Sequence, residues 1–244
     1  MFISVSQLER QMGVHKTIGR FFVDRKPPEN NSFWKGRLLY VGLGTGYVFI
    51  PIYYDILHRI GLPITELLDE RHIRFMEQLM HFATLHEANE ISILEELEFV
   101  RIMLKGRIQN DKFYDSLNKY FDQLLLRPLG DLGLPYPALN RADVFLYVLC
   151  DLPLSAIQRN LAIKYWYALL PNYLIMDDIR DYDQDKENKD QNLILDLGDG
   201  TAAFEKAFEL MQKNCEIINL INPLLGNYLS DFKEDLRKYV PEKI

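Results

Sequence analysis

The stretch Tyr173-Leu-Ile-Met-Asp-Asp-Ile-Arg-Asp-Tyr-Asp-Gln-Asp185 joins a largely apolar run to an acidic cluster. The apolar run covers residues 161–176, and residues 177–190 contain seven acidic residues against three basic ones. If one helix continues from the run into the cluster, Asp177, Asp181 and Asp185 lie four residues apart and share a face. Carboxylates at this spacing repel one another, and a bound cation would turn the repulsion into attraction. We therefore predict a long helix that ends in a site for Mg²⁺, which prefers oxygen ligands.

The same helical periodicity recurs along most of the chain. Apolar residues return at intervals of three and four within residues 76–83, 93–104, 113–124 and 204–218. The alternation with a period of two that is typical of strands is scarce. After residue 200 the pattern predicts two helices, separated near Asn222-Pro223. The sequence therefore predicts an all-α fold, a helical bundle that forms a single domain over residues 1–244.

Composition and charge argue against several classes of protein. The chain has 28 Lys and Arg against 35 Asp and Glu, and its net charge of −7 argues against binding to nucleic acid. Its two cysteines are too few for a disulfide scaffold. Because no signal peptide is evident, we expect a cytoplasmic protein. Residues 38–54 carry no charge, but they contain three glycines and Pro51, so we expect them to be buried in the protein and not to span a membrane.

The acidic stretch resembles the second aspartate-rich motif of class I isoprenoid synthases, the trans-prenyl diphosphate synthases, squalene synthase-like enzymes and class I terpene synthases. The resemblance rests on Asp177-Asp-Ile-Arg-Asp181 and the Asp185 that follows, on Asn192-Leu-Ile-Leu, and on the helices expected between 203 and 239. It implies an all-α isoprenoid-synthase-type bundle in which Asp177, Asp178 and Asp181 bind catalytic Mg²⁺. Asp185 would be a further metal ligand.

The resemblance also implies a substrate and a reaction. A prenyl diphosphate would bind through Mg²⁺, and its allylic carbon would ionise for prenyl transfer or terpene formation. Basic residues should reach the diphosphate, and the candidates are Arg180, Lys186 and Arg127. An apolar, aromatic cavity should shield the carbocation, and its candidate side chains are Phe82, Tyr120, Trp166, Tyr167 and Tyr173. A homodimer is compatible with this interpretation.

The sequence departs from that family in its first half, because no second DDxxD string exists upstream. Glu87 and Glu90, in His86-Glu-Ala-Asn-Glu90, are the preferred substitutes, since they follow an apolar stripe and are three residues apart. Asp55 is the other candidate. Because the first motif is degraded, a non-catalytic partner subunit of an isoprenoid synthase is an alternative.

A different enzyme class is suggested by Gly42-Leu-Gly-Thr-Gly46, which resembles motif I of S-adenosylmethionine-dependent methyltransferases. In that hypothesis Asp69 binds a ribose, and residues 142–148 and 172–176 form later strands of a Rossmann-like sheet. Against it, the chain lacks an acid two residues before Gly42, and residues 71–126 have the periodicity of helices. The isoprenoid-synthase interpretation is therefore preferred.

A third hypothesis is a di-iron carboxylate bundle, prompted by His81, His86, Glu87 and Glu90. Such bundles take a Glu-x-x-His motif from each of two helices. All five histidines of this chain lie in its first 86 residues, so the later helices supply none. The histidine distribution therefore argues against a di-iron centre.

Overall fold

The computed structural model describes residues 3–42, 45–123 and 127–240, and over these residues the fold is all-α, as predicted. In this part of the chain there is no strand, and Leu129 and Leu132 form an isolated antiparallel bridge. The helices are α1 (Val5–Met12), α2 (Lys16–Asp24), α3 (Thr45–Arg59), α4 (Ile64–Leu67), α5 (Glu70–Glu87), α6 (Ile93–Leu104), α7 (Asp111–Phe121), η1 (Pro137–Asn140), η2 (Asp143–Asp151), α8 (Ala156–Arg180), α9 (Tyr182–Asn188), α10 (Leu193–Asp196), α11 (Thr201–Asn219), α12 (Pro223–Leu236) and η3 (Arg237–Tyr239), where η marks a 3₁₀ helix.

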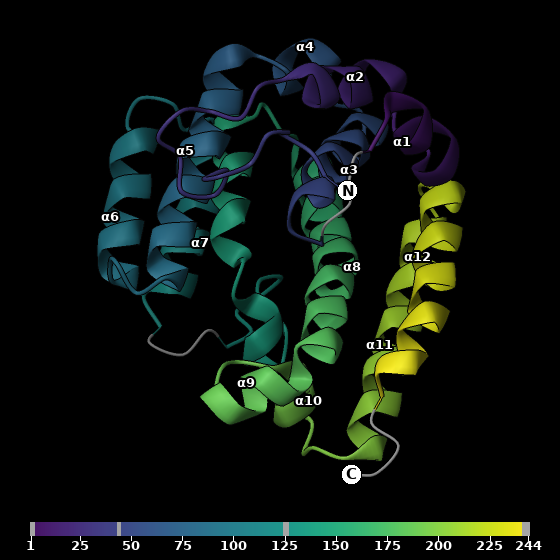
Figure 1. Ribbon diagram of the computed structural model, residues 1–244. Helices are drawn as coiled ribbons and strands as arrows, with labels where there is room; N and C mark the ends of the chain where they lie inside the picture. Colours follow the sequence, from purple (N-terminus) through teal and green to yellow (C-terminus); the bar gives the residue numbers. More distant parts are fainter. Residues whose placement is uncertain (1–2, 43–44, 124–126, 241–244) are drawn as a thin grey trace.

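Helix α8 is the centre of the bundle (Figure 1). It packs against α3 on one side and against α11 and α12 on another. The 3₁₀ helix η2 packs against α5, α6 and α7, which form the opposite edge of the molecule. The two short helices α9 and α10 lie beyond the C-terminal end of α8, and α1 packs against α12. The buried apolar side chains of all these elements form one continuous core.

The predicted long helix is confirmed, and local sequence explains its bounds. Ser155 caps the N-terminus of α8 by accepting a hydrogen bond from the backbone of Gln158, whose side chain accepts in return from Ser155. The helix then runs to Arg180, and the following Asp181 is its C-cap. Its central turns are buried nearly all round because neighbours cover it on several sides, so their apolar residues are not confined to one stripe.

The predicted break between the last two helices is also confirmed. Asn222 is the N-cap of α12, and its side chain accepts a hydrogen bond from the backbone N–H of Leu225. Pro223 occupies the first helical position, where its missing N–H costs nothing. The Asn222 side chain also donates to the backbone carbonyl of Met12, so it joins the start of α12 to the end of α1.

The methyltransferase hypothesis predicted two strands, and both of these predictions are wrong. Residues 143–151 form η2, and residues 172–176 belong to α8. Both segments are short apolar runs, and periodicity alone does not separate a buried strand from a buried helix. The sheet of that hypothesis is therefore not formed in the described ranges of the chain.

The uncharged run between residues 38 and 54 is divided between a loop and a buried helix. Leu38 and Leu39 are exposed in the loop before α3, whereas Pro51, Tyr53 and Tyr54 are buried within α3. Among the helices described, none combines the length and apolar character needed to cross a lipid bilayer. This finding agrees with the expectation that the run does not span a membrane.

A buried carboxylate joins η2 to α7 and α8. Asp143 is 1% exposed, and its Oδ1 accepts a hydrogen bond from Trp166 Nε1 at 3.0 Å. Its Oδ2 accepts from the hydroxyls of Tyr120 and Tyr167, at 2.7 and 2.9 Å. Tyr167 Oη in turn accepts from the backbone N–H of Gly133 at 2.6 Å. Three aromatic residues that the sequence suggested for a substrate cavity therefore bind a structural carboxylate instead.

We predict that Asp143 makes stability fall between about pH 4 and pH 6. Burial raises the pKa of Asp143 to about 6 from its usual 3.8, although the three hydrogen bonds oppose the rise. The folded protein therefore binds this proton more tightly than the unfolded chain, and the free energy of unfolding decreases by about 2–3 kcal/mol as pH rises through that window. Denaturant unfolding at several pH values measures the effect.

The matched comparison is Asp143→Asn beside the exposed Asp115→Asn. Asp143→Asn should destabilise the protein by about 1–3 kcal/mol, because an amide cannot accept from all three donors. It should also remove the decrease between pH 4 and 6, which Asp115→Asn should retain. An equal pH dependence in all three proteins would contradict the assignment to Asp143.

Candidate functional site

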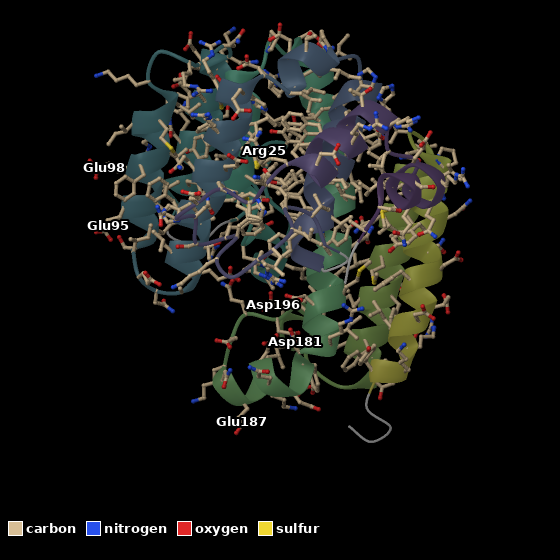
Figure 2. All side chains as sticks on the ribbon, turned by 45° about the horizontal axis from the view of Figure 1, so that its top comes forward. Arg25, Glu95, Glu98, Asp181, Glu187 and Asp196 are labelled. Carbon is tan, nitrogen blue, oxygen red and sulfur yellow. The ribbon has the colours of Figure 1, made fainter. Side chains whose placement is uncertain are left out.

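The acidic cluster lies where α8 ends and α9 begins. Although α9 is a separate helix, the helical hydrogen bonds continue across the junction: Asp181 N–H donates to Asp177 C=O at 2.9 Å, and Asp185 N–H donates to Asp181 C=O at 2.8 Å. The three aspartates therefore follow one another on successive turns, as the spacing predicted. Figure 2 shows Asp181 at this end of the molecule, with Asp196 of α10 beside it and Glu187 farther out on α9.

The carboxylates of this cluster affect one another electrostatically. Partial burial raises the pKa of Asp181, and the negative charges of Asp177 and Asp185 raise it further, while Arg180 lowers it. Half of the Asp177 side chain is exposed, and its carboxylate forms an ion pair with Arg141 at 4.0 Å. A cation placed among these carboxylates would be attracted by all three.

Asp178 has a different environment from Asp177. Its side chain is only 1% exposed, and Oδ1 accepts a hydrogen bond from Arg141 Nη2 at 2.7 Å. Oδ2 accepts from the backbone N–H of Leu193 at 2.8 Å, so this carboxylate fastens α8 to the start of α10. Burial raises the pKa of Asp178, and Arg141 and Leu193 oppose that rise. Its contacts therefore give Asp178 a structural role and do not support its assignment as a metal ligand.

Arg141 is the residue at this site that the sequence interpretation missed. It lies between η1 and η2, and its Nη1 also donates to the carbonyl of Ala138 at 2.8 Å. Its guanidinium is partly exposed between Asp178 and Asp177. No local pattern marks Arg141, because its acidic partners are more than 30 residues away along the chain. Its position makes it the basic side chain best placed to meet an anion held by the cluster.

The basic residues named from the sequence have other surroundings. The Arg180 guanidinium lies over the rings of Phe232 and Tyr239, which turns it toward the C-terminal helices. Lys186 donates to Asp199 at 2.6 Å and to Tyr182 at 3.0 Å, and these hydrogen bonds raise its pKa. Arg127 is exposed in the segment before η1.

Tyr173 lies one turn before Asp177 and is buried in α8. Its hydroxyl makes no hydrogen bond within the described residues, and burial raises its pKa. Of the remaining aromatic candidates, Phe82 stacks on Phe99 of α6, with ring centroids 4.3 Å apart. The role of Tyr173 in a substrate site stays a prediction, whereas Phe82 belongs to the packing between α5 and α6.

The candidates for a second acidic group, opposite the Asp177 cluster, have different surroundings in the structure. Glu87 and Glu90 are exposed, at the C-terminal end of α5 and in the turn after it, and Glu90 is close enough to His81 to oppose the fall in the pKa of that histidine. Asp55 instead is buried and holds three segments together. It accepts from Arg59 at 2.6 Å, from the backbone of His15 at 2.7 Å and from Asn222. Asp55 is therefore a structural residue, and the role of Glu87 and Glu90 as metal ligands stays a prediction.

Mg²⁺ is compatible with part of the predicted ligand set. Within the described ranges no group of three or more His, Cys, Asp or Glu side chains is already arranged around one point. Mg²⁺, however, commonly uses one or two carboxylates and completes its shell with water and substrate phosphate. Asp177 and Asp181 offer that pair from successive turns, while Asp185 Oδ2 accepts a hydrogen bond from Asn192 at 2.8 Å. The donor chemistry thus fits Mg²⁺ at Asp177 and Asp181.

The predicted methyltransferase site is only partly visible. Leu43 and Gly44, in the middle of the glycine loop, lie outside the described residues. Asp69, the proposed ribose ligand, caps the N-terminus of α5 by accepting from the backbone N–H groups of Arg71 and His72. That role accounts for Asp69 without a nucleoside.

A second polar cluster, which the sequence did not indicate, joins α3, α5 and η2. Buried His72 lies between Tyr54 Oη, 2.9 Å from its Nε2, and Asp151 Oδ2, 3.0 Å from its Nδ1. Arg107 donates two hydrogen bonds to Asp151, at 2.6 and 3.1 Å. Despite its burial, the hydrogen bonds from His72 and Arg107 hold the pKa of Asp151 below its usual value. Both ring nitrogens of His72 therefore have partners, and His72, Arg107 and Asp151 also line a polar cavity.

Comparisons with protein-family models, with curated proteins and with solved structures find no match for this chain. Inference of function therefore depends on the residues and contacts of the chain itself. Among these, the acidic cluster at the end of α8 is the strongest candidate for a site.

We predict that Asp178→Asn destabilises the protein by about 1–3 kcal/mol, because it leaves a half-buried Arg141 without its charged partner. Arg141→Met should cost a similar amount. The double variant should cost less than the sum of the two, since the interaction is lost only once. Denaturant unfolding of the four proteins gives the coupling energy, and strictly additive effects would show that this ion pair contributes nothing to stability.

Proposed function

We propose that this protein is a Mg²⁺-dependent enzyme that uses an allylic prenyl diphosphate, with the acidic cluster at the end of α8 as its diphosphate site. The observation that carries the proposal is the placement of Asp177 and Asp181 on successive turns at the end of a long buried helix. The all-α fold is compatible with the isoprenoid-synthase type that the motif resembles.

The residues have separate roles in this proposal. Asp177 and Asp181 hold Mg²⁺, which when bound neutralises the leaving diphosphate as a Lewis acid. Arg141, 4.0 Å from Asp177, donates hydrogen bonds to phosphate oxygens, and Asp178 keeps its guanidinium in that position. Leu170 and Leu174 lie seven and three residues before Asp177 on the same face of α8, so they offer the apolar surface that keeps water from a carbocation.

Glu87 and Glu90 are the proposed opposing carboxylates. In Figure 1 both α5 and α8 descend from the end of the molecule at which α4 lies, so their C-terminal ends point the same way. Such a parallel course is what a site with one acidic group on each helix requires. The described contacts do not join the two groups, and a bridging diphosphate with its metal ions would do so.

A non-catalytic partner subunit of such an enzyme is the second candidate. It is favoured by the engagement of Asp178 with Arg141 and by the internal partners of Arg180 and Lys186. These contacts remove charged groups that a diphosphate site would otherwise use. The two candidates differ in whether the chain alone binds Mg²⁺ and diphosphate.

We predict that Mg²⁺ and pyrophosphate together raise the melting temperature more than the sum of their separate effects. A ligand that binds only the folded state stabilises it by about 2.7 kcal/mol at a hundredfold excess over its dissociation constant. S-adenosylmethionine should have no effect. Thermal melts with each ligand alone and in combination provide the measurement. No joint shift, with a normal melt of the free protein, would favour the non-catalytic candidate.

We predict that Asp177→Asn abolishes Mg²⁺-dependent release of pyrophosphate from an allylic prenyl diphosphate, because the ion loses an anionic ligand. The same substitution should change the stability of the free protein by no more than about 0.5 kcal/mol, because Asp177 is half exposed. Asp183→Asn is the matched control: it removes the same charge from an exposed position rotated off the shared face, so it should retain most activity.

A loss of several kcal/mol in the free Asp177→Asn protein would make Asp177 a structural residue and contradict its role as a ligand. Glu87→Gln and Glu90→Gln, measured in the same pyrophosphate-release assay, test the opposing group. Both residues are exposed, so their substitution should leave stability unchanged.

A further inference from the structure

The outer face of α12 contains a shallow groove at the edge of the bundle. Leu224, Tyr228, Asp231 and Asp235 follow one another at intervals of four, three and four residues, so they form one stripe along the helix. Asn227 and Phe232 flank the stripe, and Gln11 of α1 completes the lining. Leu224 is 50% exposed. The groove is thus an amphipathic strip, apolar at the N-terminal end of α12 and acidic toward its C-terminal end.

The charged side chains that line the groove are all negative. The lining contains two carboxylates and no basic side chain. Two nearby basic residues have partners elsewhere: Lys233 donates to Gln212 of α11, and Arg237 donates to Glu205 and lies over the ring of Phe208. Arg180 does not belong to the lining, but its guanidinium lies over the Phe232 ring at the edge of the groove. Asp235 also stands in the last turn of α12, where the helix dipole adds to the negative potential.

The aromatic residues of the groove suit a cation. Tyr228 and Phe232 are neighbours, with ring centroids 6.4 Å apart. The ring of Phe232 already receives a cation from within the chain, because the Arg180 guanidinium lies 5.1 Å from its centroid. Ring faces attract guanidinium and ammonium groups, and a nearby carboxylate strengthens the attraction. Tyr228, half buried in the groove beside Asp231, offers the same chemistry to an outside group.

We propose that this groove binds a basic amphipathic segment of a partner protein. An apolar side chain of the segment would cover Leu224 and Tyr228, and Lys or Arg side chains four residues apart would meet Asp231 and Asp235. A second copy of the chain fits poorly, because two such grooves facing each other would bring four carboxylates together. Anionic lipid headgroups would be repelled for the same reason.

The test is selection from a random peptide library displayed on phage, with the full chain immobilised. We expect enriched peptides that carry two basic residues at a spacing of three or four beside an apolar residue. Synthetic peptides of the enriched type should lose affinity at least about tenfold against Asp231→Lys/Asp235→Lys, and their binding should weaken as salt increases. Neither aspartate makes a hydrogen bond or ion pair with the described residues, so this variant should fold normally.

The matched control is Glu98→Lys on α6, which also reverses an exposed helical carboxylate. Figures 1 and 2 place α6, with Glu98 pointing outward, at the opposite edge of the molecule from α12. Peptide affinity should be unchanged in this control. The proposal is overturned if the enriched peptides lack basic residues, if no peptide is enriched, or if both variants lose affinity equally. Sedimentation of the free protein as a dimer that the Asp231/Asp235 variant dissociates would assign the groove to a second copy instead.

Discussion

The carboxylate of Asp143 holds together parts of the bundle that no apolar contact alone would align. Its three hydrogen-bond donors come from α7 and from two adjacent positions of α8. Because the carboxylate is fully buried, each lost donor would leave a charged oxygen unsatisfied, so the geometry around it admits little variation. Gly133 is packed closely against the same network. Its φ is +81°, and a Cβ there would lie 2.8 Å from the Tyr120 ring. This network thus fixes α8 against η2, α7 and the segment that contains Gly133, while α3 and α11 pack against its other sides.

Adjacent aspartates at the end of α8 show how the same residue type takes opposite roles. Asp178 is buried against Arg141 and Leu193, whereas its neighbour Asp177 is half exposed and its charge raises the pKa of Asp181. The Asp178 carboxylate thus supports the exposed carboxylates: its ion pair with Arg141 joins the last turn of α8 to the segment between η1 and η2, and its hydrogen bond from Leu193 joins that turn to the start of α10. A metal site built on Asp177 and Asp181 would stand on a rigid base and not on a loop.

The sequence predicted the helices well where periodicity was long and capping was local, as in α8 and at Asn222-Pro223. It allowed a wrong alternative at residues 143–151, where an apolar run without polar spacing fits a buried strand as well as a 3₁₀ helix. It did not separate Asp178 from Asp177, because the difference depends on Arg141, 37 residues from Asp178 along the chain. The sequence also left Asp55 as a candidate metal ligand for the same reason: its partners His15 and Asn222 lie far from it along the chain.

The contact between α1 and α12 has a consequence for the order in which the molecule assembles. Helix α1 contacts α2, but it also contacts α12, which is synthesised more than 200 residues later, and Asn222 closes that junction through the Met12 carbonyl. During translation α1 therefore has no permanent neighbour at that face until α12 has left the ribosome. Pairing of such distant segments carries a high loop-closure entropy, which slows folding. We expect α1 to pack early against α2 and its junction with α12 to form last.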